Sequence, residues 1–182
     1  MKYIIEHLEP EVFEWCVLEY THISEIVGKD NLIFTNVKDK EKLQHLGEVH
    51  SESIVNLNFP NMCILDPEAE EKISQNDCQK FDYLLFGGIL GDYPMRKRTK
   101  QELSDKIKAE KRNIGKKQMS TNTAVYVVHE ISKGKNDFDF QDDLIIPIEK
   151  GEEIILPYRY VKVNEKILVP KGFIEFVKKK GF

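Results

Sequence analysis

The segment at residues 81–91, FDYLLFGGILG, constrains the fold more than any other stretch of this 182-residue chain. Its first part is apolar almost throughout, which is typical of a central parallel strand covered on both faces. Gly87, Gly88 and Gly91 follow at once. In open α/β sheets, ligands bind beyond the carboxyl ends of the strands, where glycine lets the backbone approach them closely. The segment therefore predicts a buried strand that ends in a glycine turn at a binding site.

Other apolar runs alternate with helical patterns along the first 134 residues. We expect strands at residues 2–8, 31–37, 61–67 and 81–86, and helices at residues 12–27, 39–46, 99–112 and 121–131. Strands that alternate with helices indicate an α/β fold with a mostly parallel sheet between helices. Short extended runs between residues 144 and 169 and a last helix at 173–179 make a tail too short for a second domain. We expect one domain, residues 1–182, with residues 135–182 packed on it as a C-terminal extension.

Composition excludes several classes of protein. The formal net charge of −4 argues against a protein that mainly wraps nucleic acid. Three widely spaced cysteines without a C-x-x-C pair, and five scattered histidines, indicate neither a disulfide framework nor a metal site. No apolar run approaches the roughly 18–20 residues of a membrane span. We expect a cytoplasmic protein with no membrane partner.

The glycine segment does not match a nucleotide-binding motif. It lacks the G-x-G-x-x-G spacing, and the chain contains neither a P-loop nor the G-x-S-x-G motif of many hydrolases. A second candidate segment is residues 113–124, NIGKKQMSTNTA, where a turn of small residues leads into an apolar helix. Backbone N–H groups at that helix start can hold the polar edge of a ligand. From the residues alone, an ordinary turn and an ordinary capped helix remain the alternatives.

Several short sequences together resemble one known group of enzymes. They are EHLE at residues 6–9, EW at 14–15, LEY at 18–20, CILDP at 63–67, FDYLLFGGILGDYP at 81–94, RTK at 98–100, KQMSTNTA at 117–124 and LPYRYV at 156–161. With them the chain resembles the SPOUT superfamily of knotted methyltransferases. Within it, the resemblance is closest to the small family that contains the fungal arginine methyltransferase of a small-subunit ribosomal protein.

The resemblance implies a deep trefoil knot and S-adenosylmethionine as cofactor, and it makes the two candidate segments loops of one cofactor site. The cofactor-binding residues that it implies are Leu65, Asp66, Pro67, Phe86, Gly87, Gly88, Ile89, Leu90, Gly91, Asn113, Ile114, Gly115, Gln118, Met119, Thr121, Thr123 and Ala124. We predict that Gly88→Val abolishes cofactor binding by placing a branched side chain in the space of the ligand.

Methyl transfer to an arginine requires carboxylates that clamp the guanidinium and help take up its proton. The candidates are Glu6, Glu9, Glu14, Glu19 and Asp92, with Trp15 as a ring that can stack on the guanidinium. For each of them the alternative is a solvated acid or, for Trp15, a core residue. RNA-modifying members of the superfamily often carry an arginine after an early strand, whereas this chain has the acidic EHLEPE there. That difference favours a cationic substrate.

The function predicted from the resemblance is an S-adenosylmethionine-dependent protein arginine N-methyltransferase that acts on a small-subunit ribosomal protein. The alternatives are a SPOUT-class methyltransferase of ribosomal or transfer RNA, and an inactive binding module in ribosome assembly. A basic run from Arg96 to Lys117 is either a solvated helix face with loops, or a patch that contacts ribosomal RNA or groups of the cofactor and substrate. Because the fungal relative is a monomer, we expect a monomer here.

Overall fold

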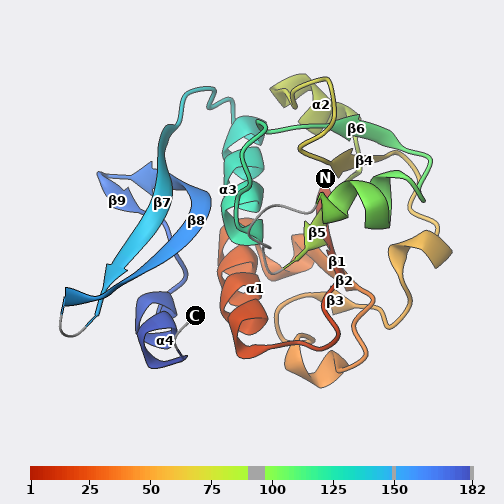
Figure 1. The fold of residues 1–182 in the computed structure, drawn as a ribbon. Coiled ribbons are helices and arrows are strands. Elements are labelled where there is room, and N and C mark those ends of the chain that lie inside the picture. The colour runs from red at the N-terminus through yellow and green to blue at the C-terminus, as the bar shows by residue number, and fades with distance from the viewer. Residues whose placement is uncertain (90–96, 149–150, 181–182) are drawn as a thin grey trace.

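The structure is a computed structural model that describes residues 1–89, 97–148 and 151–180. Its main part is a sheet of parallel strands in the order β3-β2-β1-β5-β4-β6 (Figure 1). The strands are β1 Lys2–His7, β2 Leu32–Thr35, β3 Glu48–Val49, β4 Met62–Leu65, β5 Tyr83–Gly88 and β6 Glu110–Arg112. All of the described pairings in this sheet are parallel. The predicted α/β class with a mostly parallel sheet is therefore confirmed, and the knot stays a prediction.

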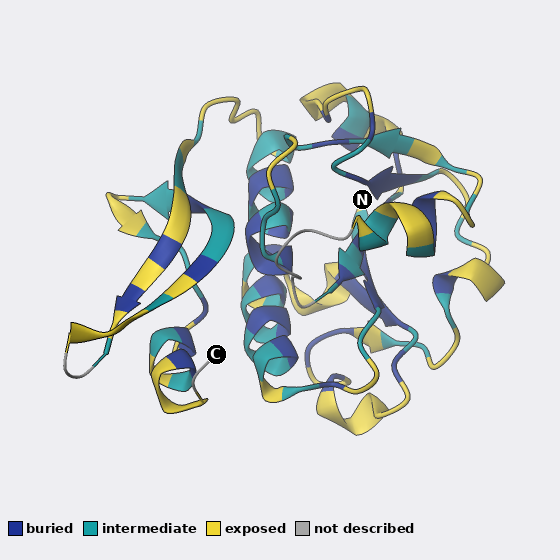
Figure 2. Ribbon diagram, in the orientation of Figure 1, coloured by how far each residue is buried: buried dark blue, intermediate teal, exposed yellow. Residues whose placement is uncertain are grey.

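Alternate residues of the strands pack on opposite faces of the sheet, as the two-residue period of a strand requires. On one face Tyr3 and Ile5 pack under helices α1, Glu14–Val27, and α3, Thr121–Ser132. On the other face Ile4 packs with residues such as Leu103. Both faces of the central strands are buried (Figure 2). The near-continuous apolar strands thus follow from a sheet that is covered on both sides.

The C-terminal part forms a separate antiparallel sheet beside α1 (Figure 1). Its elements are β7 Asp139–Pro147, β8 Glu153–Val163, β9 Lys166–Ile167 and helix α4 Phe173–Lys180. An apolar cluster holds this part against α1, and Trp15 belongs to it. The Trp15 ring lies 4.9 Å from the ring of Phe173 and 6.3 Å from that of Phe176, measured between centroids.

Two predicted helices differ from the structure, and one helix of the structure was not predicted. Residues 99–112 are not one helix: a π-helical turn, Lys100–Ser104, is followed by β6, because pairing with β4 overrides the helix propensity of these charged residues. Residues 39–46 form only a 3₁₀ turn, Lys40–Lys42. Helix α2, Gln75–Lys80, was not predicted, although Ser74 and Asp77 form a capping box at its start.

The glycine pair is also placed differently from the prediction. Gly87 and Gly88 are the last residues of β5 and pair with Glu6 and His7 of β1, so they belong to the strand and not to a turn.

None of the helices in the described parts of the chain is long and apolar enough to cross a membrane.

Candidate functional site

A cavity opens at the carboxyl ends of β4 and β5, where parallel sheets commonly bind ligands. Three predicted segments meet in it. The residues that line it and were predicted are Leu65, Asp66, Pro67, Phe86, Gly87, Ile89, Ile114, Gly115, Gln118, Met119, Thr121 and Ala124. The two candidate segments, far apart in the sequence, therefore form one site.

Other predicted cofactor residues do not line the cavity. Gly88 faces away from it: a Cβ built there would lie 2.3 Å from Tyr20 Oη and 2.8 Å from Ile5 Cγ2. The reason given for Gly88→Val is therefore wrong, because the added side chain would meet the core and not the cavity. Thr123 is buried, and its hydroxyl lies 2.8 Å from that of Ser120. Leu90 and Gly91 lie outside the described residues.

Asn113 supports the cavity from behind. Its side-chain amide donates to the carbonyl oxygens of Ala69 and Glu71 at 2.9 and 3.0 Å, and its Oδ1 accepts from the N–H of Gly115 at 2.9 Å. Gly115 has a φ of 116°, a backbone conformation that residues other than glycine rarely adopt. Asn113 thus fixes the turn that carries the cavity residues Ile114 and Gly115.

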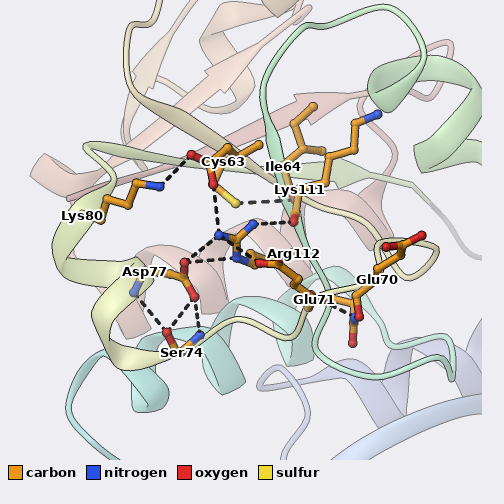
Figure 3. A network of polar contacts seen from close by, with 11 residues as sticks. Cys63, Ile64, Glu70, Glu71, Ser74, Asp77, Lys80, Lys111 and Arg112 are labelled. Atoms are coloured by element: carbon orange, nitrogen blue, oxygen red, sulfur yellow. Dashed lines mark hydrogen bonds and ion pairs between the residues drawn. The ribbon is translucent and has the colours of Figure 1, made fainter.

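Arg112, which precedes this turn, is held by a network of acids (Figure 3). Its guanidinium contacts Asp77 and Glu110 at 3.0 Å each, and its pKa is raised by these partners against the opposing effect of burial. Its carbonyl oxygen accepts from the N–H of Asp66 at 2.9 Å. Arg112 therefore ties β6 to the end of β4 and is engaged within the protein.

The charged wall of the cavity was missed as part of the site. It consists of the charged residues Glu68, Lys97, Arg98, Lys100 and Lys117, with the uncharged Thr99 among them. Lys97 pairs with Glu68 at 2.7 Å, and Lys117 pairs with Asp142 of β7. The RTK sequence at 98–100 was a signal within the resemblance, but a basic run alone does not reveal which of its side chains face a cavity.

The end of β4 contributes a buried carboxylate. Asp66 accepts a hydrogen bond from Ser104 Oγ at 2.6 Å through one oxygen and from the N–H of Glu68 at 2.9 Å through the other. These bonds fix the side chain at the edge of the cavity that it lines. The predicted LDP sequence is thus part of the site.

The start of α3 is held from two sides. Thr121 Oγ1 donates to the carbonyl oxygen of Gly87 at 3.3 Å. From the C-terminal sheet, the N–H of Arg159 donates to the carbonyl oxygen of Gln118 at 2.8 Å, and Arg159 and Met119 form a parallel bridge. The LPYRYV sequence therefore supports the cavity-lining segment before α3.

Among the candidate catalytic acids, Glu6 is fully engaged within the fold. It is buried at the end of β1 and accepts hydrogen bonds from Thr35 Oγ1 at 2.5 Å, Ser53 Oγ at 2.6 Å and the N–H of Ile54 at 3.0 Å. These partners join β1, β2 and the turn after β3. Glu6 therefore stabilises the sheet, and the structure does not place it as a group for a substrate.

Two further acids pair with cations. Glu9 contacts Arg98 Nη1 at 2.7 Å, and the same guanidinium donates to the carbonyl oxygen of Leu8 and to Glu102. Glu14 is exposed and lies 3.7 Å from Lys180 of α4. Glu9 is thus linked to the cavity through Arg98, whereas Glu14 lies at the outer end of α1. Asp92 lies outside the described residues.

On α1, the buried Glu19 is paired with the partly buried Trp15. Trp15 Nε1 donates to Glu19 Oε1 at 2.8 Å, while its ring packs against α4. Burial raises the pKa of the Glu19 carboxyl to about 7, although hydrogen bonds from Trp15 and from the backbone of Thr121 and Asn122 lower it. Glu19 therefore lies directly behind Thr121, a residue of the cavity wall.

The chain is similar over almost its whole length to one group of known proteins. The family model described as "Protein arginine N-methyltransferase SFM1-like" matches residues 2–181. Protein arginine N-methyltransferase SFM1 of Saccharomyces cerevisiae is 35% identical over 98% of this chain and 95% of that protein.

Solved structures of the yeast arginine methyltransferase SFM1 have the same fold. The complex with SAH is 34% identical, with a TM-score of 0.87 over 97% of this chain and 94% of that chain. The complex with SAM is 34% identical, with a TM-score of 0.86 over 98% of this chain and 90% of that chain. The similarity covers both the parallel sheet and the C-terminal part.

Proposed function

The chain belongs to the SFM1-like protein arginine N-methyltransferase family, and from this premise we propose that it methylates an arginine of a small-subunit ribosomal protein with S-adenosylmethionine. The observation that carries the proposal is the cavity in which the ends of β4 and β5 meet the start of α3. The yeast relative was solved with SAM and with SAH.

The residues of the cavity fit this cofactor. Leu65, Phe86 and Met119 offer apolar surface for a ring system, as cofactor sites generally do. Lys100 also lines the cavity and forms no ion pair with another described residue, so it is free to take the carboxylate of the amino-acid part. When bound, the cofactor supplies a methyl group on a positively charged sulfur.

The protein must orient the acceptor and receive a proton. Alignment of the two reacting groups accounts for much of the rate in such a displacement. Methylation of a guanidinium nitrogen releases one proton, and a group with a pKa near neutral is suited to take it up. Among the acids considered above, Glu19 combines a pKa of about 7 with a position behind the cavity wall. We assign it to the acceptor side of the site.

The proposed substrate is cationic. The loop after β1 carries the acids Glu9 and Glu11, and Glu9 pairs with the cavity residue Arg98. In the basic run, Lys106, Lys108 and Lys111 form no ion pair with a described residue, and we propose that they contact ribosomal RNA around the target protein.

We further propose that the enzyme acts as a monomer in the cytoplasm, where its three free, buried cysteines stay reduced.

Labelled S-adenosylmethionine tests the proposal directly. The protein is incubated with the cofactor and small ribosomal subunits, and the product is digested separately with protease and with nuclease. Label released by protease alone supports a protein acceptor. Label released by nuclease alone would support an RNA methyltransferase, and cofactor binding without transfer would support an inactive binding module.

A further inference from the structure

A second groove lies at the opposite end of β4 from the cofactor cavity. Its volume is about 500 Å³, within the range of roughly 300–1,000 Å³ that is typical of ligand sites. Met62, the first residue of β4, lines this groove, and Leu65, the last, lines the cavity. Because a strand rises about 3.3 Å per residue, these two wall residues lie roughly 10 Å apart.

Two segments form the walls of the groove. One surrounds the 3₁₀ turn Ile54–Asn56, and the other leads from the π-helical turn into β6. Phe59, Met62 and Ile107 line it as partly buried members of the apolar cluster on this face of the sheet. Val55, also in the lining, is 45% exposed. The groove thus presents apolar surface to the solvent.

The groove carries positive charge that the protein does not balance. Lys106 and Lys108 line it, are exposed and form no ion pair with a described residue. Glu110, an acid in the lining, is already paired with Lys80 at 2.6 Å and with Arg112 at 3.0 Å. The two lysines therefore favour an anionic ligand. This local excess contrasts with the formal net charge of −4 of the whole chain.

Phe59 gives the groove an aromatic ring that is held in place. Its ring lies 4.9 Å from that of Tyr83 at an interplanar angle of 72°, and 6.1 Å from that of His50 at 89°. Such edge-to-face contacts are favourable, so two neighbouring rings support Phe59 while it stays partly exposed. Asn58, which is exposed beside it in the lining, carries an amide that can both donate and accept hydrogen bonds.

Single-stranded RNA matches this combination of groups. Its phosphates pair with lysines, its bases stack on aromatic rings, and amides can bond to the edges of the bases. Duplex RNA offers the same phosphates but keeps its bases stacked on one another, so it cannot use Phe59. The carboxylates of an acidic peptide can pair with the lysines, but they gain nothing from an exposed aromatic ring. The lining therefore favours a single strand over both.

We propose that this groove binds a single-stranded segment of ribosomal RNA, with a base stacked on Phe59 and phosphates at Lys106 and Lys108. The choice of ribosomal RNA rests on the proposed function, because RNA is the polyanion that surrounds a target in a ribosomal protein. Residues 97–110 connect the two sites, since Lys100 lines the cofactor cavity and Lys106 lines the groove. RNA in the groove thus holds the subunit close to the point of methyl transfer.

The test measures the binding of a fluorescent oligouridylate of about ten nucleotides, a length within the site sizes of single-strand grooves, and of an RNA duplex of equal length. The full chain is compared with Phe59→Leu and with the double variant Lys106→Ala/Lys108→Ala. Melting temperatures establish that each variant is folded.

The matched control for the loss of two charges is Lys166→Ala/Lys171→Ala. Both lysines are exposed and form no ion pair with a described residue. They lie in β9 and just before α4, elements that Figure 1 shows on the other side of α1 and α3 from β4 and β6. This control should bind both RNA probes as the parent does.

We expect the parent to bind the single strand more tightly than the duplex. Phe59→Leu should weaken binding of the single strand by about fivefold or more, as for the loss of one stacked base, without changing its salt dependence. The groove lysine variant should reduce the slope of log affinity against log salt by about 1.4, since each phosphate contact to a single strand contributes about 0.7. Parental binding in both groove variants, or a preference for the duplex, would overturn the inference.

Polyglutamate tests the other class of partner. If it binds as tightly as the oligouridylate and depends equally on Phe59, the groove is a site for acidic protein segments and the inference is wrong. Binding that is weaker and independent of Phe59 supports the assignment to RNA.

Methyl transfer from labelled S-adenosylmethionine gives a second measure. Both groove variants should raise KM for small ribosomal subunits and leave kcat and the affinity for the cofactor at parental values. An unchanged KM would contradict a role of the groove in binding the subunit. A parent that transfers no methyl group would instead refute the proposed function, because the RNA-binding measurement does not depend on methyl transfer.

Discussion

The hydroxyl of Thr121, in the first turn of α3, donates to the carbonyl oxygen of Gly87, the second-last residue of β5, at 3.3 Å. This contact joins two segments that are 34 residues apart in the sequence. Both line the same cavity. The bond therefore holds one wall of the proposed cofactor site against the other.

Thr121→Val should weaken cofactor binding while the protein stays folded. The substitution keeps the shape of the side chain but removes a bond of about 0.5–1.5 kcal/mol, so we expect the Kd to rise roughly two- to tenfold. Calorimetric titration with S-adenosylhomocysteine measures the change. An unchanged Kd would show that this contact does not position the site.

The two neighbouring glycines should respond differently to substitution by alanine. A Cβ at Gly87 would lie 3.0 Å from Ile89 Cδ1 and 3.3 Å from Thr99 Oγ1, both in the cavity wall, so Gly87→Ala should weaken cofactor binding. A Cβ at Gly88 would collide with Tyr20 and Ile5. Gly88→Ala should therefore cost about 1–3 kcal/mol of stability, the range seen for overpacked cores.

Thermal unfolding and calorimetric titration of both glycine variants separate these effects. For a chain of this size, each kcal/mol lowers the melting temperature by about 2–4 °C. If Gly88→Ala binds cofactor more weakly than Gly87→Ala at the same folded fraction, the assignment of the two faces is wrong.

Glu19 should make stability depend on pH. Its pKa is 4.5 in the unfolded chain and about 7 in the folded protein, so between these values the folded state holds the proton more firmly. The unfolded state then binds fewer protons, and the free energy of unfolding falls as pH rises from about 4.5 to 7. The loss at pH 8 is on the order of 3 kcal/mol, since one pKa unit corresponds to 1.36 kcal/mol.

Comparison with Glu19→Gln isolates this contribution. Burial lowers the pKa values of His7, His22 and His129, and these groups change stability in the opposite direction over part of the same range. Urea unfolding at pH 5 and at pH 8 gives the difference for both proteins. The parent should lose more stability than Glu19→Gln; equal losses would argue against a raised pKa at Glu19.

Glu6→Ala should destabilise the fold. The change leaves the buried donors of Thr35, Ser53 and Ile54 without their acceptor, and we expect a loss of about 3 kcal/mol in the free energy of unfolding. Urea unfolding measures this loss. A variant with parental stability and no methyl transfer would restore Glu6 as a catalytic candidate.

The parallel sheet and the position of the site were predictable from local patterns. The apolar run that ends at Gly87 and the small residues before Thr121 each mark the end or start of an element, and a parallel sheet brings such positions to one edge. The resemblance linked the two segments. The sequence did not show which of the two adjacent glycines faces the cavity. That depends on which side of β5 packs against Tyr20 of α1.

The roles of the charged residues could not be read from the sequence. Glu6, Glu9 and Glu19 look alike as acids near the first strand, but their partners come from β2, from Arg98 and from the start of α3. The strand Glu110–Arg112 has a helix-like composition and forms through pairing with β4. Such assignments depend on contacts between distant segments, which single-sequence patterns do not contain.

We propose that this protein methylates an arginine in a ribosomal protein. Mass spectrometry of small-subunit proteins, after incubation with the enzyme and cofactor, tests it most directly. We predict a peptide heavier by the mass of a methyl group, with the modification on arginine, and much less of it with Gly87→Ala. Methylation on another amino acid or on RNA, or no methylation by enzyme that binds the cofactor, would contradict the proposed function.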